Sequence, residues 1–205
     1  MASADCIFVV DDDHSARRGL ARLVHAAGKN VESFASAKDF LASDSIDRSG
    51  CIVLDVRIPE MTGPELQAEL VKAGSTTPII FLSAYTDVET TAEAMKQGAV
   101  DFLTKPVDRD DLLDAICVAL ARDAENRAQK AEHSAIHERI NTLTPREHEV
   151  MTYVITGMLN KQIAAEQDIS EGTVKIHRGR VMRKLQIESV TDLVRLCEKA
   201  GIEPN

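Results

Sequence analysis

The sequence predicts two domains of different fold class: a doubly wound α/β domain with a five-stranded parallel sheet, joined by a long helical linker to an all-α, four-helix domain with a helix-turn-helix. Over about the first 120 residues, short apolar runs alternate with helical patterns. No Gly or Pro lies between Val107 and Thr144, and only helical patterns follow residue 141. A chain of 205 residues also suits two domains, since single domains commonly have about 100–150 residues.

The expected strands are short apolar runs rich in β-branched residues and bounded by polar ones, which is typical of buried parallel strands. The clearest runs are 6–10, 51–55 and 78–83, and 30–34 and 99–104 are weaker. The helical patterns between and after them cover 15–27, 36–43, 64–73, 87–97 and 110–122. In a sheet of this kind the functional crevice lies at the carboxyl ends of the strands.

The fifth helix can continue to Arg139, about 45 Å from Asp110 at 1.5 Å per residue. We therefore expect the α/β domain at 1–123, a helical linker at 124–141 and the all-α domain at 142–205. Small residues recur along this helix four and three positions apart: Cys117, Ala121, Ala124, Ala128, Ala131 and Ala135. Two interpretations stay open, a solvated helix of high alanine propensity or a helix that pairs along this seam.

Four helices are expected after residue 141. Thr144 and Glu147 form a capping-box pattern that opens the first, which ends at Gly157. The second covers about 159–167, and Ser170 is a suitable N-cap for a third that reaches Leu185. Ser189 begins the fourth. A helix, a short turn and a helix carrying basic residues together indicate a helix-turn-helix.

Charge is distributed unevenly between the two domains. The net charge of −9 belongs entirely to residues 1–123, which hold 21 acidic and 12 basic residues. Residues 172–187 contain five Lys and Arg and no acid. A concentrated positive segment beside an acidic remainder indicates one anionic partner that binds at one place.

The composition excludes several classes of protein. No apolar run approaches the roughly 20 residues of a membrane span, and the N-terminus lacks the basic region of a secretory signal. The four cysteines lie far apart, without a CxxC pair, among apolar neighbours. We therefore expect a cytoplasmic protein without membrane attachment, with reduced and buried thiols and no structural zinc.

Polar residues follow the expected strands where their carboxyl ends should meet. Asp11, Asp12 and Asp13 follow the first, Asp55 ends the third, Ser83 ends the fourth and Lys105 follows the fifth. Crowded carboxylates repel, and oxygen ligands without Cys or His favour Mg²⁺. This set suits in-line attack on a phosphoryl group. Alternatively, Asp11–Asp13 only cap the first helix.

The segments VVDDD, LDVRIPEMTG, FLSAYTD and AVDFLTKP resemble, in order and spacing, the receiver-domain motifs of two-component response regulators. The resemblance implies that the domain at 1–123 is a receiver and that Asp55 is its phosphoacceptor. It further implies a Mg²⁺ site formed by Asp12, Asp55 and the carbonyl of Arg57, with Asp11 acting through water. Ser83, Phe102 and Lys105 take the positions of the phosphoryl-sensing hydroxyl, the aromatic switch and the conserved lysine. Phenylalanine at the switch position is frequent in the FixJ subgroup.

Residues 142–200 resemble the LuxR-type DNA-binding domain of the NarL/FixJ class, with TVKIH at the start of its third helix. The resemblance places Lys175 and Ile176 toward the major groove, and Lys161, Thr173 and His177 near the DNA backbone. The full set of expected DNA-binding residues is Lys161, Thr173, Val174, Lys175, Ile176, His177, Arg178, Arg180 and Lys184. Gly179 departs from members with a polar base-reading residue there, so no DNA sequence preference carries over.

The combined expectation is a phosphorylation-switched transcription factor and not an enzyme beyond its own phosphorylation and dephosphorylation. A partner histidine kinase would phosphorylate Asp55 with Mg²⁺ present, and a homodimer would bind double-stranded DNA. One alternative is a phosphohydrolase of the haloacid-dehalogenase kind, since Asp11–Ser15 fits its D-x-D-x-[ST] opening with Asp11 as nucleophile. Another is a constitutive DNA-binding protein whose receiver does not respond to phosphorylation.

Overall fold

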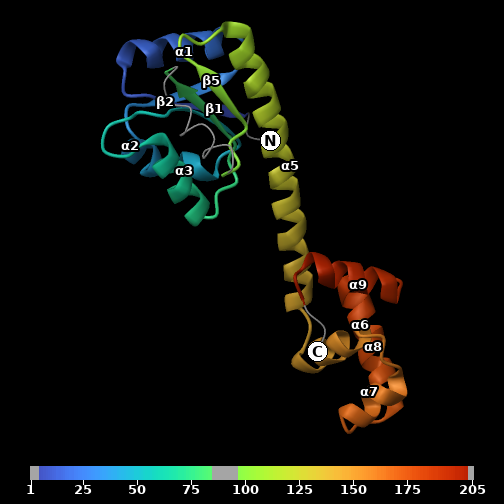
Figure 1. Ribbon diagram of the computed structural model, residues 1–205. Helices are drawn as coiled ribbons and strands as arrows, with labels where there is room; N and C mark the ends of the chain where they lie inside the picture. The colour runs from blue at the N-terminus through green and yellow to red at the C-terminus, as the bar shows by residue number, and fades with distance from the viewer. Residues whose placement is uncertain (1–4, 85–96, 203–205) are drawn as a thin grey trace. The chain divides into compact units, whose positions relative to one another are not determined.

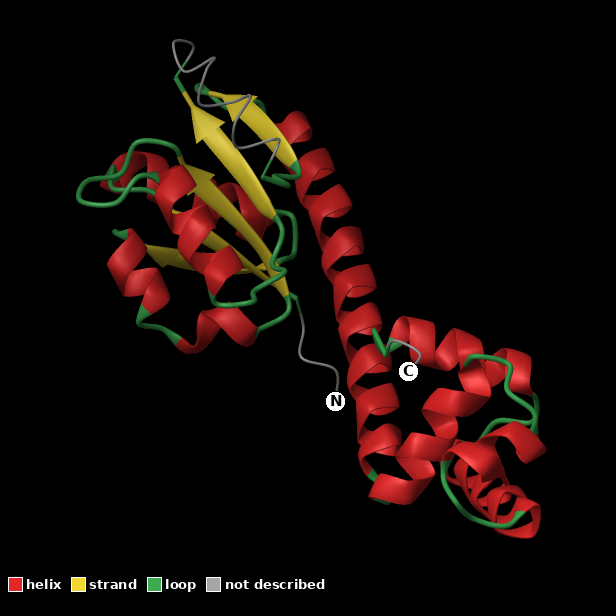
Figure 2. Ribbon diagram, turned by 60° about the horizontal axis from the view of Figure 1, so that its bottom comes forward, coloured by secondary structure: helices red, strands yellow, loops and turns green. Residues whose placement is uncertain are grey.

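The computed structural model describes residues 5–84 and 97–202, and the chain forms two compact units, Met1–Arg127 and Ala128–Asn205 (Figure 1). The first unit contains the parallel sheet (Figure 2), and the strand order is β2-β1-β3-β4-β5. Its strands are β1 (Cys6–Val10), β2 (Asn30–Phe34), β3 (Gly50–Asp55), β4 (Ile79–Ser83) and β5 (Asp101–Thr104). The predicted α/β class and its five strands are confirmed, with limits that differ by two residues at most.

Helices cover both faces of the sheet. They are α1 (His14–Ala26), α2 (Ala37–Leu41), α3 (Gly63–Lys72) and α5 (Arg109–Asn141), with a short 3₁₀ helix at Asp44–Asp47. Alternate residues of β1 point to opposite faces: Phe8 packs in a core with α2 and α3, and Val9 in a core with α1 and α5. The helix predicted over 87–97 falls almost wholly outside the described residues.

Register places the carboxyl ends of the strands at one edge. Val10 is paired with Leu54 of β3, and Asp55 is paired with Leu82 of β4. The central strands are completely buried, which explains why they appear as continuous apolar runs in the sequence. Polar residues at their ends are therefore held on a rigid, closely packed base.

At the amino ends of the strands, the buried carboxylate of Asp123 connects α5 to the start of β3. Asp123 Oδ2 accepts hydrogen bonds from Ser49 Oγ at 2.9 Å, Gly50 N at 3.0 Å and Arg127 Nε at 2.8 Å. The same Arg127 guanidinium donates to the carbonyls of Asp47 and Arg48. These hydrogen bonds hold α5 against the start of β3 about four turns after the helix begins.

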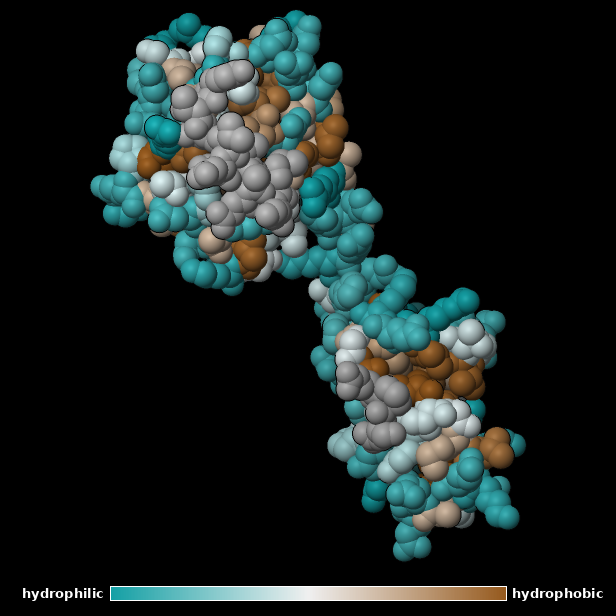
Figure 3. All heavy atoms as spheres, in the orientation of Figure 1, coloured by the Kyte–Doolittle hydropathy of each residue, from teal (hydrophilic) through white to brown (hydrophobic). Residues whose placement is uncertain are grey.

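The seam of small residues on α5 is exposed along its whole length, from Cys117 to Ala135. Figure 3 shows hydrophilic side chains on the visible surface of the middle of this helix. The two interpretations of the seam, a solvated helix face or a face that pairs with another helix, therefore both stay open. The expectation that all four thiols are buried is wrong for Cys117, which is exposed, while Cys6, Cys51 and Cys197 are buried. Neither α5 nor any other described helix combines the length and the hydropathy needed to cross a membrane.

The second unit packs α6 (Pro145–Ile155), α7 (Asn160–Glu166), α8 (Glu171–Leu185) and α9 (Val190–Lys199) around one core. Ile136 and Ile140 from the last turns of α5 are part of this core. The expected caps are present: Thr144 Oγ1 accepts from Glu147 N, and Ser170 Oγ accepts from Thr173 N. The turn between α7 and α8 contains Asp168 at a φ of 50°. The predicted four-helix, helix-turn-helix architecture is confirmed.

Candidate functional site

The carboxyl ends of the strands bring the predicted acidic and basic side chains into contact. Lys105 Nζ, just after β5, lies 2.8 Å from Asp11 Oδ2 and 2.5 Å from Asp55 Oδ2. These three residues are separated by up to 94 positions in sequence. Asp11 is fully buried, and Lys105 keeps 28% of its side chain exposed. The ammonium group therefore spans the two carboxylates at the mouth of the pocket.

The pocket has the ligand set of a hard divalent cation. Oxygen atoms of Asp11, Asp12 and Asp55 lie within 4.8 Å of one another. Asp11 Oδ1 accepts from Asp13 N at 2.8 Å, and Asp55 Oδ1 accepts from Arg57 N at 3.1 Å. Three ionised carboxylates exceed the single positive charge of Lys105 by two units. Carboxylate oxygens and this excess charge fit Mg²⁺.

For both Asp11 and Lys105, burial and ion pairing shift the pKa in opposite directions. Burial raises the pKa of Asp11, and the hydrogen bond from Lys105 only partly opposes this effect. Burial by itself would lower the pKa of Lys105, but its hydrogen bonds to Asp11 and Asp55 raise that pKa overall. Lys105 is therefore fully protonated at neutral pH. The cost of keeping Asp11 ionised favours a further cation in the pocket.

The two residues expected to sense a phosphoryl group lie on the adjoining strands. Ser83, at the end of β4, is 1% exposed, and its Oγ donates to Ala84 O at 2.7 Å. Phe102, on β5, is half-buried against the core, with its ring centroid 6.0 Å from that of Phe81. Ser83 therefore lies at the carboxyl end of β4 and Phe102 on the neighbouring strand β5, and their roles in sensing a phosphoryl group stay a prediction.

The alternative interpretation of the acidic run, that its residues cap the first helix, holds for Asp13. This residue is the N-cap of α1, and its side chain accepts from Ser15 N and Ala16 N, which lowers its pKa. Asp12 is exposed, so it projects a carboxylate to the rim of the pocket. The three consecutive aspartates therefore have different environments, one buried, one at the rim and one in the helix cap.

Two further residues support the pocket and were not anticipated from sequence. Arg17 donates to Asp11 O at 2.6 Å and Asp12 O at 3.2 Å, which fixes the backbone after β1. Gly63 N donates to Val56 O, and a Cβ at Gly63 would lie 2.7 Å from Asp55 O. The M-T-G sequence after the third strand was the available signal for the second contact.

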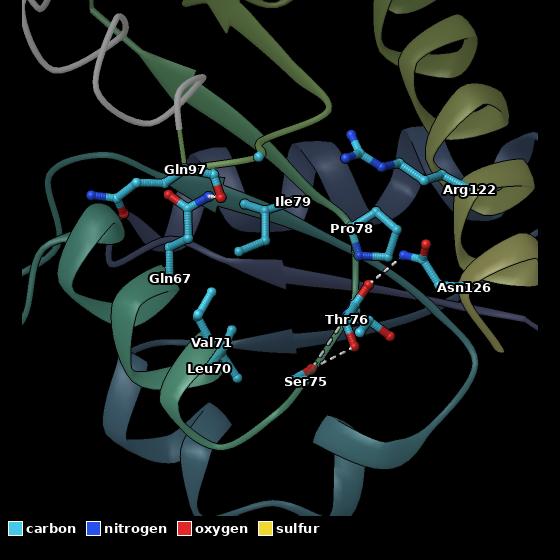
Figure 4. A pocket seen from close by; sticks show the side chains of 12 residues that line it. Gln67, Leu70, Val71, Ser75, Thr76, Pro78, Ile79, Gln97, Arg122 and Asn126 are labelled. Carbon is cyan, nitrogen blue, oxygen red and sulfur yellow. Dashed lines mark hydrogen bonds between the residues drawn. The ribbon is translucent and has the colours of Figure 1, made fainter. Parts of the chain in front are cut away.

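A separate cavity of about 180 Å³ lies at the other edge of the sheet, where β4 begins (Figure 4). Leu70, Ile79 and Arg122 are among its lining residues, and Asn126 Nδ2 donates to Thr76 O beside it at 2.9 Å. Since Ile79 and Ser83 lie at opposite ends of β4, this cavity is separate from the acidic pocket.

The predicted DNA-binding residues of the second unit differ in exposure. Lys161 on α7 and Lys175, Ile176 and Arg180 on α8 are exposed. Thr173, His177 and Arg178 are partly buried, and Arg178 donates to Asn160 Oδ1 at 3.0 Å. An open hollow of about 590 Å³ lies between the two helices, lined by Leu159, Asn160, Lys161, Glu171, Lys175 and Arg178.

Two of the predicted contacts need correction. Val174 is 0% exposed and belongs to the core of the second unit, so its side chain does not reach DNA. Lys184 donates to Glu147 Oε2 at 2.6 Å and to Thr142 O at 2.8 Å. Its ammonium group is therefore engaged in holding α8 against α6, with two of its three hydrogens already donated within the second unit.

Comparisons with known proteins identify both units. Residues 7–117 match the response regulator receiver domain, and residues 141–197 match the luxR family of bacterial regulatory proteins. The chain belongs to the response regulators. It is a transcriptional response regulator of the NarL/FixJ type, with a receiver and a LuxR-type DNA-binding domain.

The relatives of this response regulator match it over nearly its full length. Nodulation protein W of Bradyrhizobium diazoefficiens is 44% identical over 97% of this chain and 88% of its own. The response regulator TodT of Pseudomonas putida is 43% identical over 96% and 86%, and FixJ of B. diazoefficiens is 41% identical over 98% of both chains. These matches give no support to a haloacid-dehalogenase phosphohydrolase.

Two solved structures that match nearly all of this chain are also similar. The response regulator StyR aligns with a TM-score of 0.82 at 43% identity, covering 96% of this chain and all of that chain. Full-length FixJ from B. japonicum aligns with a TM-score of 0.59 at 39% identity, covering 98% of both chains. The predicted family and fold are thereby confirmed.

Proposed function

We propose that Asp55 accepts a phosphoryl group from a partner histidine kinase, and that this modification promotes homodimerisation and binding to specific DNA sites. The supporting observation is the contact of Lys105 with both Asp11 and Asp55 at the rim of a pocket with three carboxylates. A receiver domain and a DNA-binding domain in one chain fit this pair of partners. Since its proposed partner is chromosomal DNA, we expect the protein in the cytoplasm.

In the proposed reaction, a carboxylate oxygen of Asp55 attacks the phosphorus in line with the donor. The new O–P bond forms as the bond from phosphorus to the donor breaks, and the donor's leaving group keeps that electron pair. Asp11, Asp12, Asp55 and the carbonyl of Arg57 would hold Mg²⁺, which supplies charge neutralisation on the phosphoryl oxygens. Lys105, already 2.5 Å from Asp55, offsets the remaining negative charge.

The phosphoryl group would bring up to about two negative charges into the pocket. We propose that the Ser83 hydroxyl then turns from Ala84 O to a phosphoryl oxygen, and that Phe102 rotates inward into the space this leaves. A shift from 1:99 to 99:1 between the two states requires about 5.5 kcal/mol of differential stabilisation. New interactions across the dimer interface would supply part of this energy.

We propose that α8 lies in the major groove, with Lys161, Lys175, Arg178 and Arg180 near phosphates or guanine edges. The exposure of Lys161, Lys175 and Arg180 on α7 and α8 supports this placement, and Arg178 lies partly buried beside them. Because the contacts are largely ionic, DNA affinity should fall with salt by about 0.9 log unit per log unit of salt for each phosphate neutralised.

The proposal is tested with acetyl phosphate and Mg²⁺ on the wild type and on Asp55→Asn. The wild type should gain the mass of one phosphoryl group as an acid-stable, base-labile adduct, shift toward a dimer in light scattering and bind DNA more tightly. Asp55→Asn should show none of these changes. Equal adduct yields in the two proteins would refute Asp55 as the acceptor. DNA affinity that is indifferent to the adduct would indicate a constitutive DNA-binding protein.

A further inference from the structure

The cavity at the start of β4 is large enough to hold a small molecule. Its volume of about 180 Å³ exceeds the roughly 150 Å³ that suffices to hold benzene in an engineered protein cavity. Its wall combines residues of α3, of the loop from α3 to β4, of the segment before β5 and of α5 (Figure 4). All of these belong to the first unit, so the cavity is formed within one compact domain.

Hydrogen bonds between these segments hold the wall in shape without a ligand. Asn126 Nδ2 donates to Thr76 O at 2.9 Å, which joins α5 to the loop before β4. Gln67 is 3% exposed, and its Nε2 donates to Gln97 O at 3.2 Å, which joins α3 to the segment before β5. A wall that is already ordered loses little conformational freedom when a ligand binds.

The inner part of the wall is apolar. Leu70, Pro78 and Ile79 line the cavity and are themselves buried, whereas Val71 and Thr76 are exposed and lie at its mouth. A hydrocarbon group that enters the cavity therefore leaves water and contacts carbon atoms. This part of the site would accept a compact apolar body.

The charge at the cavity is a single positive one. No acidic residue belongs to its described lining, and Arg122 is the one basic residue there. Arg122 is exposed, and it forms no ion pair or hydrogen bond with any residue that the structure describes. Figure 4 shows its side chain extending from α5 toward the cavity, across from Gln67 on α3. An arginine placed in this way can bind a carboxylate through two parallel hydrogen bonds.

We propose that this cavity binds a small monocarboxylate. The carboxylate would pair with Arg122, and a compact hydrocarbon body of about six carbons would lie against Leu70, Pro78 and Ile79. A phosphate or a dicarboxylate would bring a second negative charge, which no other cation in the described lining matches. The site uses no residue of the acidic pocket, so ligand binding there does not depend on phosphorylation of Asp55.

The test titrates benzoate and cyclohexanecarboxylate into the full-length, unphosphorylated protein, with calorimetry and heteronuclear NMR as readouts. Both should bind with a Kd of about 0.1–1 mM and should shift the side-chain amide signals of Gln67 and Asn126. Three further probes each lack one feature: acetate lacks the apolar body, benzamide lacks the charge, and inorganic phosphate lacks the body and adds charge. Each of these should bind at least about tenfold more weakly.

Arg122→Gln should weaken benzoate binding at least about tenfold and leave the weak binding of benzamide unchanged, because only the charged ligand uses the guanidinium. The matched control is Lys130→Gln, which removes an exposed cation about two turns later on α5, outside the cavity lining. It should bind benzoate as the wild type does. Both changes lie at exposed positions, and unfolding midpoints equal to that of the wild type would show that the fold is intact.

Three results would overturn the proposal. The first is that neither carboxylate reaches saturation over the expected range of concentration. The second is that Arg122→Gln binds benzoate as tightly as the wild type does. The third is that the NMR shifts fall on residues of the acidic pocket and not on Gln67 and Asn126. None of these results would bear on phosphorylation of Asp55 or on DNA binding, which the acetyl phosphate experiment tests separately.

Discussion

Lys184 and Glu147 form a partly buried ion pair that joins the last turn of α8 to the first turn of α6. Their Nζ and Oε2 atoms are 2.6 Å apart, and the Glu147 side chain is 2% exposed. The Glu147 carboxylate also accepts from Thr144 N as part of the capping box of α6. One carboxylate therefore serves a helix cap and a contact between helices, and Lys184 also donates to Thr142 O after the end of α5.

Replacement of Glu147 by Gln should destabilise the second unit by about 1–2 kcal/mol, since Gln retains the capping-box geometry and loses only the charge-assisted bond. The hydrogen bond from Lys184, followed by that from Thr144 N, lowers the pKa of Glu147 from 4.5 to about 2. A lowered pKa stabilises the fold above pH 4.5, and this contribution disappears as the pH falls toward 2. Calorimetric scans of both proteins between pH 7 and 2 measure the difference.

The matched control is Arg146→Gln, because Arg146 and Glu149 form an ion pair on the same helix with both side chains well exposed. This change should alter stability by less than about 1 kcal/mol. A Glu147→Gln protein as stable as the wild type at pH 7 would contradict the assigned role of the buried pair.

Gly63→Ala should destabilise the first unit by about 1–3 kcal/mol through overpacking. The added Cβ would lie 2.7 Å from Asp55 O and 2.9 Å from a ring carbon of Phe81, neither of which is free to move. Displacement of the Asp55 backbone should also slow formation of the acetyl phosphate adduct. Scanning calorimetry and intact-mass time courses report the two effects.

Gly19→Ala is the control for this substitution. Gly19 lies within α1, and a Cβ there has no heavy atom within 4 Å. Alanine at this position should therefore stabilise the first unit by up to about 1 kcal/mol. Equal effects of the two changes would show that the contact at Gly63 is not restrictive.

Ser83→Ala should separate phosphorylation of Asp55 from the dimerisation that follows it. The adduct on Asp55 should still form, because the proposed attack does not use Ser83, but the shift toward dimer should be lost. Ser83→Thr, which keeps the hydroxyl, should retain the shift. Light scattering of both variants at matched adduct levels measures this, and a full dimer shift in Ser83→Ala would exclude the hydroxyl as the sensor.

Leu159→Ser should stabilise the second unit by about 0.5–1.5 kcal/mol. Gln162 Oε1 accepts from Leu159 N at 2.7 Å, but a leucine at the N-cap of α7 has no atom that accepts a hydrogen bond in return. Serine would complete the capping box, and little buried contact is lost, since Leu159 is 69% exposed. Urea unfolding should show the gain for Ser and none for the control, Leu159→Ala.

Arg127→Met should destabilise the first unit by about 2–3 kcal/mol, because Asp123 would keep a buried charge without its cationic partner. The control Lys130→Met changes an exposed cation less than one turn later on α5 and should have little effect. Hydrogen exchange of α5 amides localises the change. Equal protection in both variants would show that the Asp123–Arg127 contact does not hold the helix.

The sequence was sufficient to predict the sheet, the order of the helices that the structure describes and the convergence of Asp11, Asp55 and Lys105. Strands that are buried on both faces produce unbroken apolar runs, and their carboxyl ends must meet at one edge. The receiver and LuxR-type motifs were sufficient to predict the protein family. The residue pattern alone did not separate the environments of Asp11, Asp12 and Asp13, since adjacent residues with the same side chain differ only in their tertiary surroundings. The separate roles expected for Asp11 and Asp12 came from the receiver resemblance.

The predictions that needed correction concern residues whose environment depends on the helix face they occupy or on a partner far away in the sequence. Val174, Val181 and Leu185 recur seven and four residues apart, the pattern of a buried helix face, which marks Val174 as a core residue. The apolar neighbours of Cys117 along the chain lie on other faces of α5. For Lys184 no local signal existed, because its partner Glu147 lies 37 positions away.

The exposure of Cys117 gives the protein a natural attachment point for spectroscopic probes. Burial raises the pKa of the Cys51 and Cys197 thiols to about 12 and 11, and it also raises that of Cys6, so these three thiols react slowly with maleimides. A fluorophore or nitroxide should therefore label Cys117 on α5 in the unmutated chain. Distance measurements between the labels of two copies would then follow assembly without any engineered cysteine.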